Sequence, residues 1–457
     1  MIDLKKYLQY TKEQGANEAE IFLTNGREES AVVRNGKIEK IESAGDRGLA
    51  VRVIVKKRAG FAYTSSLAEA DVLRTIEMAV TNAGYAESDK FLGLPKRDSL
   101  LRASCLPSQK GCVAERPALK NYVPAAAKLT LKQLAVWAKR AEAAAYAYDK
   151  KIFATESAAA FAVVSESRIV NTYGVDVQKK KTLCGVSLEI AARSGGRMEA
   201  AYDFRYAVSP AKILPEKIGR KAAERAVRML DAVPAKTGKY DLLLIPSVAR
   251  DFLSVLSELF SAENILRQKS LLRGKLGKSV ASSKVTLIDD PFLSGLSGSF
   301  LYDGEGVPGR RRTLIKNGQL KDYFYDTYSA RKCGVKYAGN AARASIFTEP
   351  AIGPSNLYLC AGRLTQKEIL KTIDYGVLIE NIMGLHTADS VSGEFSFGAS
   401  GQLIKNGRLA GPVKDMAIAG NLTELLKSVK ACGNDLEFSG HYGAPSILIS
   451  DIMMAGK

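Results

Sequence analysis

Histidine is nearly absent from this sequence of 457 residues, with His386 and His441 as the only two. A zinc hydrolase usually takes two or three imidazoles, often two within one helical turn, together with a carboxylate or thiolate. A serine or cysteine hydrolase needs one histidine beside its nucleophile. The sequence contains neither HExxH nor HExxxH. This scarcity argues against self-sufficient zinc peptidase chemistry, and we expect both histidines to be hydrogen-bonded loop residues.

Cysteines and long apolar runs are also scarce. The six cysteines form no CxxC, which argues against a closed zinc knuckle or a dense disulfide scaffold. We expect reduced, mostly buried thiols, and the pairing of Cys105 with Cys112 stays open. No run of eighteen apolar residues occurs, and the first six residues carry acid and base where a signal peptide needs an apolar stretch. We therefore expect a cytoplasmic protein.

The charge balance is strongly basic, at +18. Residues 350–457 are nearly neutral, so the excess lies in residues 1–349, notably between Lys96 and Lys128 and between Lys212 and Lys284. Aromatic residues do not interleave with these bases, and the chain has one tryptophan. The pattern is a weak signal for nucleic acid, although a general attraction to acidic partners is consistent with it.

The turn residues indicate the fold class. Asn35-Gly36, Asn317-Gly318 and Asn406-Gly407 each separate short apolar-rich runs. Asn-Gly favours type I′ hairpin turns, because both central residues need positive φ. We therefore predict an α+β fold with antiparallel or mixed sheets and flanking helices, and disfavour a parallel nucleotide-binding sheet.

Composition also predicts the domain organisation. We expect a small N-terminal α+β domain in residues 1–90 and a basic, proline-containing linker or insertion in residues 91–126. A middle α+β segment follows in residues 127–235, and a larger, β-rich C-terminal domain fills residues 236–457.

A glycine-rich match and a polar helix face both suggest a functional site, but the residues around each argue against it. Gly304-Glu-Gly-Val-Pro-Gly309 matches GxGxxG, but a strand pattern follows it where a dinucleotide site needs a helix N-terminus. We interpret it as a glycine-rich loop that allows close backbone approach. The expected helix at 248–262 presents Ser254, Ser257 and Glu258 toward a possible cleft. Glu258 would need a metal ion or an activated water beside it to act as a general base, and the sequence offers no ligand for such a metal there.

The C-terminal third looks most like a binding site. Residues 383–401 form a long run of small side chains, interrupted by Phe395 and Phe397. Small side chains permit close approach of a peptide main chain to a sheet edge, although a tight turn at a sheet corner explains them equally well. The candidate substrate-facing residues are Arg310, Arg311, Asn340, Ser396, Phe397, Gly398, Ala399 and Ser400.

Several motifs follow one another along the chain: Gly48-Leu-Ala-Val-Arg-Val-Ile-Val55, Asp303-Gly-Glu-Gly-Val-Pro308, Gly339-Asn-Ala-Ala-Arg343, Ser392-Gly-Glu-Phe-Ser-Phe-Gly-Ala-Ser-Gly401, Ile418-Ala-Gly-Asn421 and Gly433-Asn-Asp-Leu436. In this order they resemble the motifs of the TldD/PmbA family, also called the "modulator of DNA gyrase" family. The resemblance covers nearly the whole chain apart from residues 91–126.

That resemblance distinguishes two kinds of subunit. The TldD type carries HExxxH on a helix soon after the strand that opens its C-terminal domain, and a cysteine ligand near its C-terminus. The PmbA type, also called TldE, lacks both. Here the corresponding helix has no histidine, and Ser439, Gly440 and His441 stand where a thiolate is wanted. The chain therefore resembles the PmbA/TldE-type subunit.

The resemblance implies a non-catalytic subunit of a cytoplasmic zinc metallopeptidase complex that trims leader peptides or degrades unfolded polypeptides. It implies no catalytic or metal-binding residue and no cofactor in this chain, since an HExxxH-bearing homologue supplies the zinc and the general base. The alternative is a peptide- or protein-binding homodimer with no peptidase role. Direct nucleic-acid binding is a third reading, which predicts affinity that falls steeply with salt.

Overall fold

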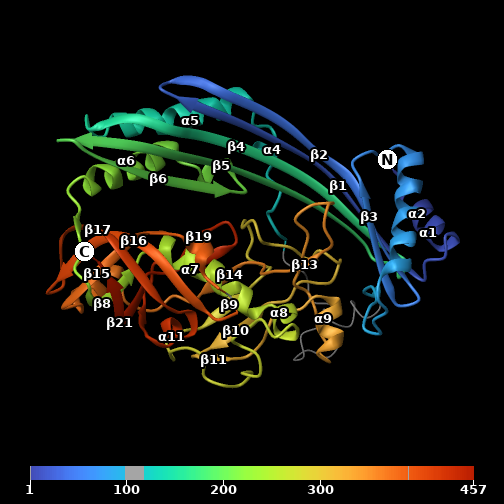
Figure 1. The fold of residues 1–457 in the computed structure, drawn as a ribbon. Coiled ribbons are helices and arrows are strands. Elements are labelled where there is room, and N and C mark those ends of the chain that lie inside the picture. Colours follow the sequence, from blue (N-terminus) through green and yellow to red (C-terminus); the bar gives the residue numbers. More distant parts are fainter. Residues whose placement is uncertain (1, 98–117, 390, 457) are drawn as a thin grey trace.

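The computed structural model describes residues 2–97, 118–389 and 391–456. Cys105 and Cys112, whose pairing the sequence left open, lie outside these residues. A long antiparallel sheet carries helices on one face and covers the C-terminal domain with the other (Figure 1). The architecture confirms an α+β fold with antiparallel and mixed sheets. None of the described helices combines the length and apolar character needed to cross a membrane.

The long sheet has the strand order β3-β2-β1-β4-β5-β6, and every neighbouring pair is antiparallel. Pairing of β1 with β4 joins residues 1–90 and 127–235 into one sheet, and the domain boundaries expected from the sequence remain predictions. The strands are β1 (Glu18–Arg34), β2 (Lys37–Val55), β3 (Arg58–Thr64), β4 (Ile152–Asn171), β5 (Asp176–Ser194) and β6 (Arg197–Ala207).

The helices cover one face of this sheet because side chains alternate along each strand. Ile21 packs under α1 (Leu4–Glu13) and α2 (Glu69–Tyr85), and Ala31 packs under α5 (Leu131–Tyr146) and α6 (Pro215–Met229). The even-numbered residues of this part of β1, including Glu20, face the C-terminal domain instead. The remaining helices of this layer are the short α4 (Pro124–Ala127) and the 3₁₀ turn η1 (Pro210–Lys212).

The three Asn-Gly pairs form the turns predicted for them. The φ angles are 51° and 73° at Asn35-Gly36, 47° and 81° at Asn317-Gly318, and 51° and 70° at Asn406-Gly407. Positive φ at both central residues defines the type I′ turn. At the first turn, both backbone N–H groups donate to the buried Glu142 carboxylate of α5, each at 2.7 Å, which fixes the hairpin tip to the helical layer.

The C-terminal domain contains a mixed seven-stranded sheet, in the order β18-β21-β8-β15-β16-β17-β7, and a six-stranded sheet, in the order β11-β10-β9-β14-β20-β19. A large apolar core lies between them. The elements are β7 (Val233–Pro234), β8 (Gly238–Leu244), α7 (Pro246–Ser257), η2 (Glu258–Phe260), α8 (Ala262–Leu266), β9 (Leu287–Asp289), β10 (Arg312–Lys316), β11 (Gln319–Leu320), α9 (Thr327–Lys332), β12 (Ala341–Ala342), β13 (Ala351–Ile352), β14 (Leu357–Leu359), α10 (Gln366–Lys371), β15 (Tyr375–Met383), η3 (Leu385–Thr387), β16 (Glu394–Lys405), β17 (Arg408–Asn421), α11 (Leu422–Lys427), β18 (Val429–Cys432), β19 (Glu437–Ser439), β20 (Tyr442–Ala444) and β21 (Ile447–Ala455).

Two helical glycines provide a matched test of the helical layer. A β-carbon on Gly219 of α6 would lie 2.0 Å from the carbonyl oxygen of Ala141 in α5, whereas one on Gly84 of α2 would meet nothing within 4 Å. We expect Gly219→Ala to lower the free energy of unfolding by about 1–3 kcal/mol, because the α5 backbone must move. Gly84→Ala should raise it by up to about 1 kcal/mol, because alanine favours helix. Urea unfolding measures both, and an undiminished stability of Gly219→Ala would contradict the close crossing.

Candidate functional site

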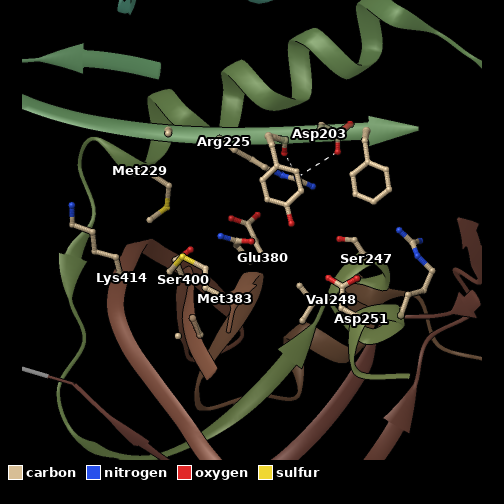
Figure 2. Close-up of a pocket in the computed structure, with 18 of the residues that line it drawn as sticks. Asp203, Arg225, Met229, Ser247, Val248, Asp251, Glu380, Met383, Ser400 and Lys414 are labelled. Atoms are coloured by element: carbon tan, nitrogen blue, oxygen red, sulfur yellow. Dashed lines mark hydrogen bonds and ion pairs between the residues drawn. The ribbon is translucent and has the colours of Figure 1, made fainter. Parts of the chain in front are cut away.

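Two cavities lie between the long sheet and the C-terminal domain. The first, of about 450 Å³, is enclosed by β6 and α6 on one side and by α7, β15, β16 and β17 on the other. In Figure 2, Asp203 and Arg225 reach into it from β6 and α6, while Ser247, Val248 and Asp251 of α7 face them. The second cavity, of about 470 Å³, lies under the middle of the sheet.

Helix α7 presents a polar face to the first cavity. The helix follows directly from β8, the strand that opens the C-terminal domain, and Pro246 occupies its first turn. Ser247, Arg250, Asp251 and Ser254 line the cavity, as their helical spacing of three and four residues allows. The apolar face, including Phe252 and Leu256, packs into the core.

Two polar groups on the wall of the first cavity lack hydrogen-bond partners. The Ser439 Oγ, at the end of β19, is buried without one, and so is Nη1 of Arg250, which lies 3.9 Å from a Glu437 carboxylate oxygen. Burial lowers the pKa of Arg250. Burial also raises the pKa of Asp251 to about 6, and the neighbouring Arg250 offsets this effect only in part.

Ion pairs join the two sides of the first cavity. Arg228 of α6 donates to Glu380 of β15 at 2.7 Å, and Lys414 of β17 pairs with Glu199 of β6. Within the upper wall, Arg225 pairs with Asp203 at 3.4 Å, as Figure 2 shows. These pairs hold the end of the long sheet against the C-terminal sheet.

The candidate residues of β16 divide between the cavity, the core and the surface. Gly398, Ala399 and Ser400 line the first cavity, and Ser396 is exposed. Phe397 is fully buried, with its ring 5.3 Å from that of Phe252 in a T-shaped contact. The small side chains of this strand are therefore the ones in position to meet a ligand, and Phe397 supports the strand from the core.

The other three candidates lie apart from this cavity. Arg310 stacks over the Tyr337 ring at 4.2 Å, and Arg311 is exposed and pairs with Asp290 at 3.2 Å. Asn340 is buried, and its side-chain amide donates to the Asp289 carboxylate at 3.0 Å. Each has a structural partner within the C-terminal domain.

The remaining polar residues suggested by the sequence divide in the same way. Ser254 lines the first cavity, whereas Ser257 shares a hydrogen bond with the Tyr442 hydroxyl and Glu258 is exposed. His386 lies in η3, and His441 lines the second cavity. Burial lowers the pKa of His441, and the ammonium of Lys181 lowers it further.

The GxGxxG segment is a loop that packs closely, and a strand rather than a helix follows it. A β-carbon on Gly306, where φ is 77°, would lie 2.5 Å from Val175, and one on Gly304 would lie 2.8 Å from the Ala341 carbonyl. Asp303 organises the loop, because one carboxylate oxygen accepts from the N–H groups of Glu305 and Val307, each at 2.9 Å.

A buried ion-pair network joins this loop to the long sheet. Arg52 of β2 lies 3.2 Å from Glu20 of β1 and 2.9 Å from Glu305 of the loop. Arg343 also pairs with Glu20 and donates to the Gly304 carbonyl at 2.6 Å. Glu305 completes the network by accepting from the Thr327 N–H at 2.9 Å. Sequence reasoning missed these residues, because isolated charges resemble solvated ones.

Removing Arg52 tests the weight of the network. We expect Arg52→Met to lower the free energy of unfolding by about 3–5 kcal/mol, because it deprives two buried carboxylates of a cation. Lys6→Met, which breaks an exposed pair with Glu69 at 2.5 Å, should leave the free energy of unfolding nearly unchanged, because solvent screens this pair. Chemical unfolding of both variants makes the comparison, and equal small losses would show that the network does not hold the layers.

Asp251 supplies a pH test of the first cavity. Its folded pKa of about 6 lies above its ordinary 3.8, so the folded chain holds the proton more tightly. This tighter binding of the proton by Asp251 therefore stabilises the folded chain fully below about pH 4, and the stabilisation is lost as pH rises through 6. We expect Asp251→Asn to be more stable than the unaltered chain by about 2 kcal/mol at pH 7 and similar to it at pH 4. Unfolding free energies at the two pH values decide, and a pH-independent difference would contradict the burial of this carboxylate.

Comparison with known proteins finds relatives along the whole chain. Residues 19–83 match domain 1 of the PmbA/TldA metallopeptidases, residues 123–230 match their central domain, and residues 237–456 match their C-terminal domain. A "Metalloprotease" of Methanothermobacter thermautotrophicus is 30% identical over 96% of this chain and 95% of its own. "Metalloprotease PmbA" of Escherichia coli O157:H7 is 26% identical over 96% and 92%.

Solved structures agree. TldE from Thermococcus kodakarensis superposes with a TM-score of 0.87 at 25% identity, covering 99% of this chain and 100% of its own. A putative modulator of DNA gyrase from Thermotoga maritima superposes with a TM-score of 0.87 at 29% identity, covering 99% of both chains. With all three domains matched in order and the fold shared from end to end, the chain belongs to the PmbA/TldD metallopeptidase family.

Proposed function

We propose that this chain is the non-catalytic, cavity-forming subunit of a cytoplasmic TldD/PmbA-type zinc metallopeptidase complex. An HExxxH-bearing homologue supplies the zinc and the general base. The substrates are leader peptides or unfolded polypeptides, which enter as extended chains. The observation that carries the proposal is the polar face of α7, which lines a peptide-sized cavity without a metal-binding side-chain set.

The residues of this cavity do not fit a zinc ion. A TldD-type subunit carries its HExxxH on the helix that follows the opening strand of the C-terminal domain, which corresponds to α7. Here that helix offers the cavity two serines, one arginine and one aspartate, and Ser439 stands near the expected thiolate. Zinc prefers imidazole, thiolate and carboxylate. Across the described ranges, no three His, Cys, Asp or Glu side chains group to hold a metal ion.

The chain's own residues instead suit an extended peptide. Among the described strands, β6 is the last of the long sheet, so one row of its main-chain groups has no partner in another described strand of that sheet. Tyr202, Phe204 and Tyr206 stack along it, with successive ring centroids 6.3 and 5.9 Å apart. Across the cavity, Gly398 and Ser400 leave room for a main chain. Such an arrangement supports main-chain hydrogen bonding with little dependence on substrate sequence.

Zinc in the partner would polarise the scissile carbonyl and activate a water molecule. The contribution of this chain is to bind the peptide in extended form and to limit access to the reacting bond. It holds no proton at the reacting atoms in this proposal.

The test measures cleavage of an unstructured peptide by this chain alone, by its HExxxH-bearing homologue alone, and by their mixture, each with and without a chelator. We expect chelator-sensitive cleavage only in the mixture. Cleavage by this chain alone would reveal a catalytic site in it. No cleavage in any sample, together with self-association and peptide binding, would favour a peptide- or protein-binding homodimer without a peptidase role.

A substitution in the cavity tests the role of its wall. We expect Ser400→Phe to lower kcat/KM of the mixture at least about tenfold, because the ring fills space that the peptide needs. Ala70→Phe, on an exposed turn of α2 that lines neither cavity, is the matched control and should leave it unchanged. Equal kcat/KM for the two variants would contradict a substrate path through the first cavity.

A further inference from the structure

The second cavity contains a pair of lysines that the proposed function leaves unused. Lys179 and Lys181 lie two residues apart on β5, so both side chains point from the sheet toward the C-terminal domain. Lys180 between them points to the opposite face, where it is exposed and pairs with Glu166 at 2.7 Å. The alternation of one strand thus sets two half-buried ammonium groups side by side over the cavity.

Each ammonium retains unused hydrogen-bonding capacity. In the described part of the chain, the acceptors they reach are backbone carbonyls: Lys179 Nζ donates to Asp303 O at 2.7 Å, and Lys181 Nζ donates to Ser297 O at 3.2 Å. A lysine ammonium has three N–H donors, so each of these groups retains two. Burial without a closely paired carboxylate costs free energy, which a bound anion would offset.

The charges around the lysines do not neutralise them. The carboxylate of Asp303 is occupied by the backbone N–H groups of Glu305, Val307 and Ala341, and its pKa is raised to about 7 by burial first and by Glu305 second. Arg343 adds positive charge but is paired with Glu20. The exposed Asp46 lies across the sheet from Lys181, through Gly26 and Ser165. Three strand spacings separate them, about 14 Å.

The rest of the cavity suits the end of a peptide. Thr24, Ser165 and Ser167 give its sheet side a hydroxyl-bearing surface, and Phe22, Ile169 and Phe300 give apolar contact. A β-carbon on Gly298 would lie 2.6 Å from the His441 side chain. Gly298 therefore lies close to His441 in the cavity wall only because glycine has no β-carbon.

The two cavities flank one turn. Ser439 and Tyr442 line the first cavity, while His441 between them lines the second. Tyr206, the last of the three stacked rings on β6, also lines the first cavity. Its hydroxyl lies against Gly440, 2.3 Å from the place where a β-carbon on Gly440 would be. This turn therefore contributes to the walls of both cavities.

We propose that the second cavity is a carboxylate site, in which Lys179 and Lys181 bind the free C-terminal carboxylate of an extended peptide. This inference rests on the proposed function for its substrate class, and it names the end of the substrate that this chain recognises. The hydroxyls beside the lysines accept or donate to the last peptide group, and the apolar wall takes the terminal side chain.

The experiment compares two N-terminally fluorescein-labelled, unstructured peptides of one sequence, one with a free C-terminus and one with a C-terminal amide. Binding to the full chain without any partner is followed by fluorescence anisotropy at low salt and at pH 6, where both lysines carry their protons. We expect the acid to bind about tenfold more tightly than the amide, because only the acid makes charge-assisted hydrogen bonds with both ammonium groups. Equal affinities for acid and amide would overturn the proposal.

Variants assign the discrimination to the lysines. Lys181→Met and Lys179→Met should each reduce the acid-to-amide ratio to less than about twofold, and Lys181→Arg should preserve part of it because it keeps the charge. Lys180→Met, the matched control on the opposite face of the same strand, should keep the full ratio. Each methionine removes the cost of burying an ammonium group, so we expect both Lys→Met variants to remain folded. Thermal unfolding checks this. A ratio unchanged in both Lys→Met variants would overturn the assignment.

Two further arms separate the sources of the anion and the contribution of the proton. Inorganic phosphate should displace the acid peptide. Lysine-dependent phosphate binding without acid-over-amide preference would replace the proposal with a free-anion site. Burial lowers the pKa of Lys179 to about 7 and that of Lys181 to about 8, so the preference should fall between pH 6 and pH 9 as these two ammonium groups lose their protons. Lys179, Asp303, Arg343, His441 and Asp46 face the same cavity, and the Lys181→Met variant, which retains them, isolates the Lys181 contribution.

This measurement is independent of the partner. A chain that discriminates acid from amide but never activates an HExxxH-bearing homologue would keep the carboxylate site and lose the proposed function. A chain that activates the homologue without discriminating would do the reverse.

Discussion

The Arg52 guanidinium, held between Glu20 of the long sheet and Glu305 of a C-terminal loop, sets the relation between the two layers. Charges buried this deeply are tolerated only when paired and hydrogen-bonded, so the loop must meet the sheet at this place. Arg343 shares Glu20 from the loop side and extends the constraint to β12. The loop and Arg343 also form part of the wall of the second cavity.

The sequence predicted the pairing of strands better than their length. Asn-Gly pairs predict hairpins because both central residues of a type I′ turn need positive φ, and this local requirement holds whatever the tertiary packing. The full length of β1 is not evident from the sequence, because Asn25–Ser30 is polar and breaks the apolar alternation. The structure carries β1 through this stretch, where hydrogen bonds to both β2 and β4 stabilise a segment that lacks an apolar face.

The site was predicted only where local alternation decides it. The run of small residues in β16 pointed to a surface for close approach, and three of its members line the first cavity. Phe397 lies in the core, and so does the side chain of Ala399 two residues further on, which also borders the cavity. Lys179, Lys180 and Lys181 read as a solvated charge run, since nothing local reveals which face the C-terminal domain will cover. The buried network of Glu20 and Arg52 was not predicted for the same reason, because it depends on Glu305, which lies 253 residues after Arg52 in the sequence.

The long sheet is attached to the C-terminal domain at both of its ends. The Glu20–Arg52–Glu305 network holds one end, and the Arg228–Glu380 and Lys414–Glu199 pairs, with parallel pairing of β7 and β17, hold the other. A twisted sheet fastened at two distant points resists lifting along the whole span between them. The spacing between the sheet and the domain beneath it is thus a property of the fold itself, set by contacts at two places far apart in the sequence.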